Sequence, residues 1–193
     1  MVEAPDQVLE ELTGGRGGGP LVGIAPIPDA PVLAAGSGAG ACLVAAEVED
    51  PGNVGAMIRT ALAAGCRHFA ATGISDPFHP RAVRTSMGSL FRIPVHRYAD
   101  SVSALNALKQ AGFRCFGAVS RGGAPLHEAG SLWRGNSTAL FLGSEAAGLP
   151  EAVVEALDGT VTIPMAEHVD SYSVNAAAAI ILYELFRGQQ PKP

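Results

Sequence analysis

Short apolar runs alternate with segments of helical period through most of this chain. The apolar runs lie at residues 42–48, 68–72, 93–98, 114–119, 138–142 and 161–163. Each is about as long as a buried strand, and several are separated by segments with the length and period of helices. This alternation predicts an α/β fold with a mainly parallel sheet and helices on both faces. Sheets of this kind bind ligands at the carboxyl ends of their strands, so functional residues are expected there.

Two helical segments carry an apolar stripe at α-helical spacing. The stripes consist of Val54, Met57, Ile58, Ala61 and Leu62 in segment 54–64 and of Val174, Ala177, Ala178, Ile181 and Leu182 in segment 173–186. Residues at these intervals share one face, so each helix is expected to pack that face on the sheet. Arg59 falls beside the first stripe. At about 100° per residue it lies on the flank of its helix, where it can reach a cleft without entering the core.

Residues 1–40 differ in composition from the rest of the chain. Glycine and proline are concentrated in residues 12–40, as is typical of linkers and turns. One or two helical turns at 7–12 and a short strand at 21–27 are expected before the boundary, which is too little to fold alone. The 193 residues are 48% hydrophobic, which is enough for one sizeable core. We therefore predict one principal domain at 41–193, preceded by a short appendage.

Membrane, exported and metal-binding classes of protein are disfavoured. No apolar run approaches the roughly 18–20 residues that would span a bilayer, and residues 1–11 are acidic where a signal peptide is basic. Cys42, Cys66 and Cys115 lie far apart and lack histidines at ligand spacing. They are expected to be small buried residues. The prediction is a soluble, cytoplasmic protein without a metal site or a disulfide framework.

The charge of the chain limits how it could hold a nucleic acid. Its formal net charge is −5, which argues against a chain-wide attraction to phosphates. The notable basic concentration consists of Arg59, Arg67, His68, His79, Arg81, Arg84, Arg92, His96 and Arg97. Such a cluster can bind phosphates locally or can simply keep the surface solvated. The composition leaves both interpretations open.

Two segments place polar or glycine residues just after an expected strand. The segment 49–55 puts Asn53 at the start of a helix, where an asparagine can cap the helix or face a ligand. The segment 143–150 begins with Gly143, which would let a ligand approach the backbone, and puts the carboxylate of Glu145 at the mouth of the strand. A turn glycine and a solvated glutamate are the alternatives.

A third segment, 163–175, contains a strand end, a polar loop and the start of the last helix, which Ser173 could cap. None of the three segments contains the glycine fingerprint of a dinucleotide site or a phosphate-binding loop. A nucleotide-binding oxidoreductase of the Rossmann type is therefore disfavoured.

Together the three segments resemble the motifs of the SpoU/TrmH class of SPOUT RNA methyltransferases. The matching residues are Asn53-x-Gly55-x-x-x-Arg59 for motif 1, Gly143-Ser144-Glu145-x-x-Gly148-Leu149 for motif 2, and Ile163-Pro164-Met165 with Ser173-Val174-Asn175 for motif 3. Three motifs in order and at the right spacing are more specific than any one of them. The resemblance covers residues 42–187 and includes the segment 84–89 between the first two motifs.

The resemblance implies an α/β domain with a C-terminal trefoil knot, the SPOUT fold. It implies S-adenosyl-L-methionine as cofactor, RNA as substrate, and a homodimer whose active sites form at the subunit interface, with no metal and no membrane. The reaction would be methylation of a ribose 2'-hydroxyl. Residues 1–40 would be the remnant of an N-terminal substrate-recognition domain with its linker, and 41–193 the catalytic domain.

The same resemblance assigns roles to individual residues. The loops of the knot would hold the cofactor at Leu142, Gly143, Gly148, Ile163, Met165 and Val174. The catalytic residues would be Asn53, Arg59, Glu145, Ser173 and Asn175. Because a guanidinium keeps its proton in proteins, Arg59 is expected to clamp phosphate and ribose and to stabilise the developing alkoxide, rather than to act as a base.

In this interpretation Asn53 orients Arg59 or the ribose, and Glu145 holds a loop or an arginine. Ser173 and Asn175 line the pocket between cofactor and substrate.

The resemblance leaves several alternatives open. Val174 stands where leucine is usual, and the loop 165–173 is about two residues longer than in many relatives, so the alignment of 168–172 is loose. Residues 76–78 and 84–94 look more like those of ribosomal-RNA members. The alternatives are a tRNA 2'-O-methyltransferase, a base methyltransferase, and a non-catalytic RNA-binding module on the same fold. The intact catalytic set argues against the last.

Overall fold

The computed structural model describes residues 3–13, 21–29, 33, 40–131, 133 and 137–187. The elements are α1 (Asp6–Thr13), β1 (Ala41–Ala46), α2 (Pro51–Ala64), β2 (His68–Thr72), α3 (Pro80–Thr85), the 3₁₀-helix η1 (Ser89–Phe91), β3 (Val95–Tyr98), α4 (Ser101–Gln110), β4 (Arg114–Ala118), β5 (Ala124–Pro125), the 3₁₀-helix η2 (Leu126–Ser131), β6 (Thr138–Leu142), α5 (Glu151–Ala156), β7 (Gly159–Thr162) and α6 (Val174–Arg187).

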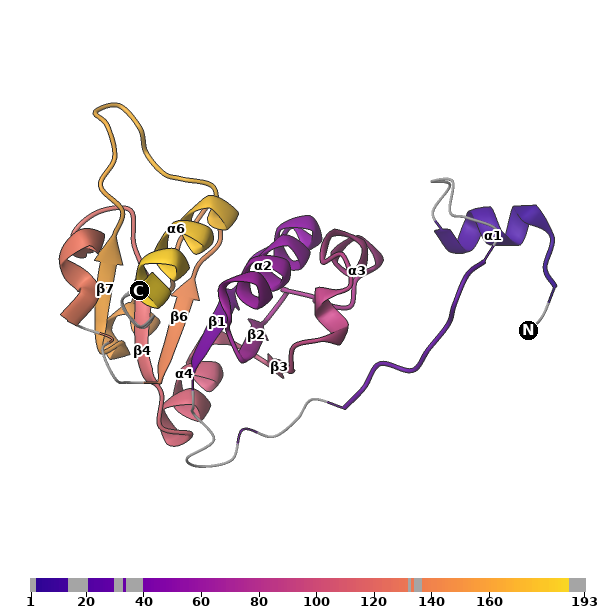
Figure 1. Ribbon diagram of the computed structural model, residues 1–193, viewed down its shortest axis with the longest axis horizontal. Helices are drawn as coiled ribbons and strands as arrows, with labels where there is room; N and C mark the ends of the chain where they lie inside the picture. The colour runs from indigo at the N-terminus through magenta and orange to yellow at the C-terminus, as the bar shows by residue number, and fades with distance from the viewer. Residues whose placement is uncertain are drawn as a thin grey trace.

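The strands form one sheet in the order β3-β2-β1-β6-β4-β7-β5, and all neighbouring pairs are parallel. The predicted parallel sheet is therefore confirmed (Figure 1). Because parallel strands end at the same edge, the loops after β4, β6 and β7, which are close neighbours in this order, lie together at the carboxyl edge. The trefoil knot that the resemblance implies stays a prediction.

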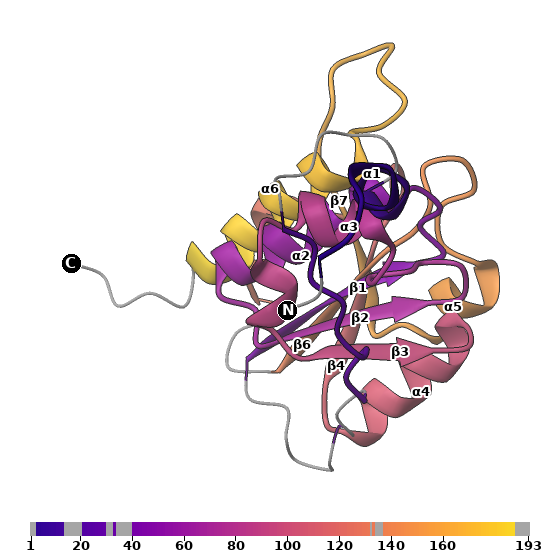
Figure 2. The ribbon, with the colours of Figure 1, turned by 90° about the vertical axis from the view of Figure 1, so that its right-hand side faces the viewer.

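Helices cover both faces of the sheet, as predicted. In Figure 2, α2 and α6 lie on one side of the strands and α4 on the other. The buried strand β1 shows why the sequence requires this arrangement, since successive residues alternate between faces. Leu43 and Ala45 belong to the core beneath α2 and α6, whereas Cys42 and Val44 belong to the core beneath α4 and α5.

Helix α2 begins three residues earlier than its apolar stripe indicates. Pro51 is the first helical residue, a position where its missing N–H is not needed, and the carboxylate of Asp50 caps the helix by accepting from the Gly52 N–H at 2.6 Å. Asn53 lies inside the first turn. The capping role considered for Asn53 is therefore wrong, and its side chain is left for other contacts.

Several further elements differ from expectation. The short strand expected at 21–27 does not form, whereas the helix expected near 7–12 does, and no residue of α1 is buried. The short elements α3, η1, β5 and η2 were not predicted. Cys42, Cys66 and Cys115 are buried free thiols, as predicted, and burial raises the pKa of Cys66 to about 12. None of the helices in the described part of the chain is both long enough and apolar enough to span a membrane.

Gly55 lies where α2 and α3 pack closely. A Cβ at this position would overlap the carbonyl oxygen of Ala82 and the hydroxyl oxygen of Thr85. The Thr85 hydroxyl is itself bonded to the Gly52 carbonyl oxygen at 3.1 Å. We expect Gly55→Ala to push α3 away and to lower the free energy of unfolding by about 1–3 kcal/mol, the usual effect of overpacking.

Urea unfolding checks this prediction. Gly130 provides the control, because a Cβ there would meet nothing within 4 Å. Alanine is intrinsically better in a helix than glycine by about 1 kcal/mol. A Gly55→Ala variant that is more stable than the parent would therefore contradict the close packing.

His68 and His96 form a pair at the start of β2 and β3. The Nδ1 atom of His68 lies 3.1 Å from the Nε2 atom of His96, which is buried. Partial burial lowers the pKa of His68, and His96 and Arg67 lower it further. Just below about pH 6.5, His68 therefore binds a proton more readily in the unfolded chain than in the folded chain.

The stability that His68 contributes as a neutral ring is present above about pH 6.5 and is lost as the pH falls through the lowered pKa of the folded state. We expect the free energy of unfolding to fall over this range more steeply in the parent than in His68→Gln, as measured by urea unfolding at a series of pH values. The exposed His127 serves as control. Equal pH slopes for His68→Gln and the parent would refute the prediction.

Candidate active site at the carboxyl edge of the sheet

A cavity of about 480 Å³ lies at the carboxyl edge, among the loops that follow β4, β6 and β7. This volume is within the range of about 300–1,000 Å³ that small-molecule sites occupy. All six residues expected to hold a cofactor line it: Leu142, Gly143, Gly148, Ile163, Met165 and Val174. Residues from three separate segments thus meet around one space, while their role as cofactor ligands stays a prediction.

The loop after β6 folds back on itself. Ser144 and Gly148 pair as an isolated bridge, and the Gly148 N–H donates to the Ser144 carbonyl oxygen at 2.9 Å. A Cβ at Gly143 would overlap the backbone of Gly148 and Leu149. Gly143 therefore gives room to the loop's own backbone on the side where a Cβ would stand, while a contact of its backbone with a ligand stays a prediction. The tight loop carries Glu145 near its tip.

Three predicted catalytic side chains, one from each motif, are joined by hydrogen bonds. The Nδ2 amide of Asn175 donates to Oδ1 of Asn53 at 2.8 Å, and the Nδ2 amide of Asn53 donates to Oε1 of Glu145. We call these residues the amide relay. Asn53 follows β1, Glu145 follows β6, and Asn175 begins α6. The relay borders the cavity, because Glu145 and the neighbour of Asn175, Val174, line it.

The carboxylate at one end fixes the direction of the amide relay. An ionised glutamate accepts hydrogen bonds and cannot donate them, so the amide nitrogen of Asn53 must face Glu145. The carbonyl oxygen of Asn53 then faces Asn175 and receives its amide nitrogen. This orientation leaves Oδ1 of Asn175 buried and without a partner among the described residues. A buried unpaired acceptor costs about 1–3 kcal/mol, which is the kind of defect that functional sites retain.

Two predicted catalytic residues lie apart from the amide relay. Arg59 is exposed on another flank of α2, and its guanidinium has no hydrogen bond or ion pair with the described residues. Ser173 is exposed, and its hydroxyl accepts from the Ala176 N–H at 3.4 Å at the start of α6. The expected contacts of Asn53 and Glu145 with an arginine are therefore not found. These two residues bind each other instead.

Other lining residues were not predicted. The cavity is also bordered by Ala118, Val119 and Ser120 at the end of β4 and by Asp170, Ser171 and Tyr172 in the loop before α6. The first three lie at the end of the apolar run 114–119 or directly after it, so the rule that found the other segments would have found them too. The second three lie in the part of the chain where the alignment was loose.

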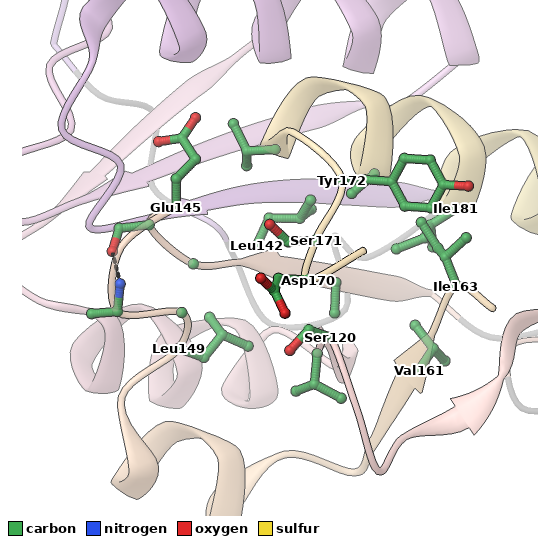
Figure 3. Close-up of a pocket in the computed structure, with 18 of the residues that line it drawn as sticks. Ser120, Leu142, Glu145, Leu149, Val161, Ile163, Asp170, Ser171, Tyr172 and Ile181 are labelled. Carbon is green, nitrogen blue, oxygen red and sulfur yellow. Dashed lines mark hydrogen bonds between the residues drawn. The ribbon is translucent and has the colours of Figure 1, made fainter. Parts of the chain in front are cut away.

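The cavity combines apolar walls with acidic groups at its rim. Figure 3 shows Leu142, Val161 and Ile163 among the apolar side chains, and the carboxylates of Glu145 and Asp170 with them. Asp170 also lies 3.6 Å from the guanidinium of Arg121, in an exposed ion pair worth little stability. Such a site can hold a flat apolar ring and a neighbouring positive charge. The described residues contain no group of three acidic, histidine or cysteine side chains suited to a metal ion.

A parallel α/β sheet with a cavity at its carboxyl edge and a polar relay drawn from three loops defines a ligand-binding α/β protein. Residues 40–183 match the model of the SpoU rRNA Methylase family. The match covers well over half of the sequence. The chain belongs to this family.

Two curated relatives illustrate the family. The chain is 38% identical over 139 residues to 23S rRNA (guanosine(2553)-2'-O)-methyltransferase RlmP of Bacillus subtilis, a match that covers 72% of the chain and 54% of the relative. It is 36% identical over 172 residues to an uncharacterised tRNA/rRNA methyltransferase of Mycobacterium tuberculosis, covering 88% of the chain and 59% of the relative. The chain thus spans a little over half the length of these relatives.

Solved structures agree with this membership. An AdoMet-bound rRNA methyltransferase from Sinorhizobium meliloti superposes with a TM-score of 0.86 at 28% identity, covering 97% of the chain and 71% of that structure. The SpoU methyltransferase AviRb from Streptomyces viridochromogenes, in complex with AdoMet, superposes with a TM-score of 0.68 at 32% identity, covering 77% of the chain and 60% of that structure.

Proposed function

We propose that this chain carries the catalytic domain of an S-adenosylmethionine-dependent RNA methyltransferase that modifies a ribose 2'-hydroxyl, in rRNA. The observation that carries the proposal is the amide relay, in which Asn53, Glu145 and Asn175 come from three distant segments and meet beside the cavity. A relative named for 2'-O-methylation of 23S rRNA supports the reaction and the substrate. Relatives named as tRNA/rRNA methyltransferases keep tRNA as the second candidate.

The cavity fits S-adenosylmethionine in chemistry and size. Leu142, Val161 and Ile163 offer an apolar slot for the adenine, and Glu145 and Asp170 lie where positive groups would be stabilised. AdoMet-bound structures of similar fold support this assignment. When bound, the cofactor supplies a methyl group on a positively charged sulfur, which an oxygen nucleophile can displace.

The residues of the chain would then position the groups that react. The unpaired Oδ1 of Asn175 is an acceptor set in place by the amide relay, and an N–H or O–H donor entering the site can satisfy it. Holding the reacting groups in line is the larger part of catalysis for such a transfer.

Arg59 would bind the phosphate and ribose of the RNA and stabilise the alkoxide that develops at the 2'-oxygen. Because Arg59 lies apart from the relay of its own chain, we infer that it serves the site of a second copy. Helix α6 leaves Ala179 and Tyr183 exposed on the side away from the core, which gives such a homodimer an apolar surface to bury. Residues 1–40 as the remnant of a recognition domain, and the cytoplasmic location, stay predictions.

The reaction can be tested by incubating the protein with labelled S-adenosylmethionine and either rRNA or tRNA, followed by digestion to nucleosides. The expected product is a 2'-O-methyl nucleoside from rRNA, identified by its mass and by an alkali-resistant 3'-linkage. A 2'-O-methyl product from tRNA alone would move the chain to the second candidate. A methylated base would refute the reaction, and no product with a folded protein would refute the activity.

A further inference from the structure

One stretch of the chain has a charge opposite to that of the whole. Residues 79–97 contain four arginines and two histidines and no aspartate or glutamate, whereas the formal net charge of the chain is −5. The stretch runs through α3 and η1 into β3. It is not part of the cavity or of the amide relay. Its positive charge therefore requires an explanation of its own.

The side chains of residues 84–93, from the end of α3 through η1, fall into a buried set and an exposed set. The inward set is buried and consists of Ser86, Ser89, Leu90 and Ile93. The outward set is exposed and consists of Arg84, Met87, Phe91 and Arg92. Met87 and Phe91 are 71% and 74% exposed, so this stretch holds two large apolar side chains in solvent above a buried layer. We call the outward set the α3–η1 face.

Backbone strain accompanies this exposure. Met87 has a φ of 49°, a left-handed conformation that side chains other than those of glycine, asparagine and aspartate rarely adopt. Strain of this kind persists where surrounding structure enforces it and gathers at functional positions. Here it belongs to the residue whose side chain is held in solvent.

The two arginines of the α3–η1 face are available to a ligand. Arg81, nearby in α3, is paired with Asp50 at 3.2 Å. Arg84 and Arg92, in contrast, have no side-chain hydrogen bond or ion pair with the described residues. Phe91 and Arg92 also border a shallow hollow of about 540 Å³, together with Pro28, Asp29, Phe78, Leu90, Ile93, Pro94 and Val95. The face thus combines free guanidinium groups, exposed apolar side chains and a hollow beside them.

We propose that the α3–η1 face binds unpaired nucleotides of the RNA substrate, away from the nucleotide that is methylated. This proposal rests on the proposed function, which makes RNA the substrate. Phe91 and Met87 offer flat or polarisable apolar surface on which a base can stack, and Arg84 and Arg92 lie beside them to bind phosphates. Stacking on a protein side chain needs a base that is already out of its helix, so the face selects a single-stranded loop rather than a duplex.

A second copy of the chain fits this face less well. In a two-fold dimer with this face on the symmetry axis, the patch meets itself, and the arginines of one copy would face those of the other with no carboxylate among residues 79–97 to balance them. A polyanion relieves this repulsion, which favours RNA as the occupant.

The test measures binding of the full chain to a labelled single-stranded RNA oligonucleotide of about 12 nucleotides, a length within the span of sequence-tolerant single-strand sites, and to the duplex of the same sequence. We expect the single strand to bind more tightly. The double variant Met87→Ala/Phe91→Ala should weaken single-strand binding about tenfold or more. Arg84→Ala and Arg92→Ala should each reduce the slope of log affinity against log salt concentration by about 1, the value for one phosphate contact.

Matched controls are available elsewhere on the surface. Ile74 is 62% exposed, so Ile74→Ala removes a comparable apolar side chain, and Arg187→Ala removes an exposed arginine that is paired with Glu184. Neither control should change RNA affinity. Calorimetric titration with S-adenosylmethionine should give the same affinity for all variants, because the α3–η1 face is not part of the cavity.

The outcomes separate this proposal from the proposed function. If the parent methylates RNA but Met87→Ala/Phe91→Ala binds the oligonucleotide as tightly as the parent, the face is not an RNA site and the proposal is overturned. If the parent binds the single strand through the face but transfers no methyl group, the proposed function fails and the face stands. If the double variant changes the oligomeric state in sedimentation and leaves RNA affinity unchanged, the face is an interface between copies and the proposal is overturned.

Discussion

Arg59→Ala is expected to slow methyl transfer by at least about a hundredfold, because one charge-stabilising group is worth roughly 3 kcal/mol in the transition state. The affinity for S-adenosylmethionine should change little, since Arg59 is exposed and does not border the cavity. Single-turnover methylation and calorimetry measure the two quantities separately. Arg59→Lys keeps the charge but loses the bidentate geometry, so intermediate activity is expected.

Arg187→Ala is the control for this prediction, because it removes an exposed arginine far along the chain. Full activity of Arg59→Ala would show that Arg59 is only a solvated charge on the flank of α2.

Asn53→Asp is expected to have a comparable effect for a different reason. An aspartate at this position cannot donate to Glu145, and two carboxylates would face each other. The aspartate can still accept from the Nδ2 amide of Asn175, but repulsion from Glu145 would displace it, and the acceptor that the relay presents would no longer be held in place. A hydrogen bond to a charged group is worth about 1.5–3 kcal/mol, so methyl transfer should fall by about tenfold to a hundredfold.

A second substitution tests the direction of the relay rather than the mere presence of its members. In Asn53→Asp/Glu145→Gln, the glutamine amide can donate to the aspartate, which can still accept from Asn175. Activity should recover in part, although the single variant Glu145→Gln brings no gain of its own. A double variant as slow as Asn53→Asp would show that the polarity of the chain of hydrogen bonds is irrelevant.

The two impaired variants together test whether the site is shared. If Arg59 serves the site of a second copy, then mixing Arg59→Ala with Asn53→Asp creates mixed dimers in which one site carries both changes and the other carries neither. Random pairing would then restore about a quarter of the parental activity. No recovery in confirmed mixed dimers would place Arg59 in the site of its own chain.

Much of the fold could be predicted because the local patterns agree with it. The strands β2 and β6 have the predicted bounds, and the stripes of α2 and α6 are the faces that pack on the sheet. Short elements without a periodic pattern were missed. Helix α3 has only six residues, begins at Pro80 after the capping His79, and packs closely against Gly55 and Gly52 of α2.

The site could be predicted as a set of residues but not as a geometry. The resemblance grouped Asn53, Glu145 and Asn175, yet nothing local shows that β6 lies beside β1, which is what brings the first two within bonding distance. The group that lies against Gly143 could not be predicted for a similar reason. This group is the backbone five residues later, and a sequence pattern does not show which side of a glycine is occupied.

The order of strands also bears on when the site can exist during synthesis. Strands β1, β2 and β3 are made first, but β6 enters between β1 and β4, and α6 must then supply Asn175 to complete the amide relay. Pairings between segments so distant in sequence form late in folding. A nascent chain that has emerged only as far as β4 therefore has most of its hydrophobic strands and no relay. The relay is complete only after α6 has been made and has docked on α2, so the proposed activity on RNA would have to wait for that step.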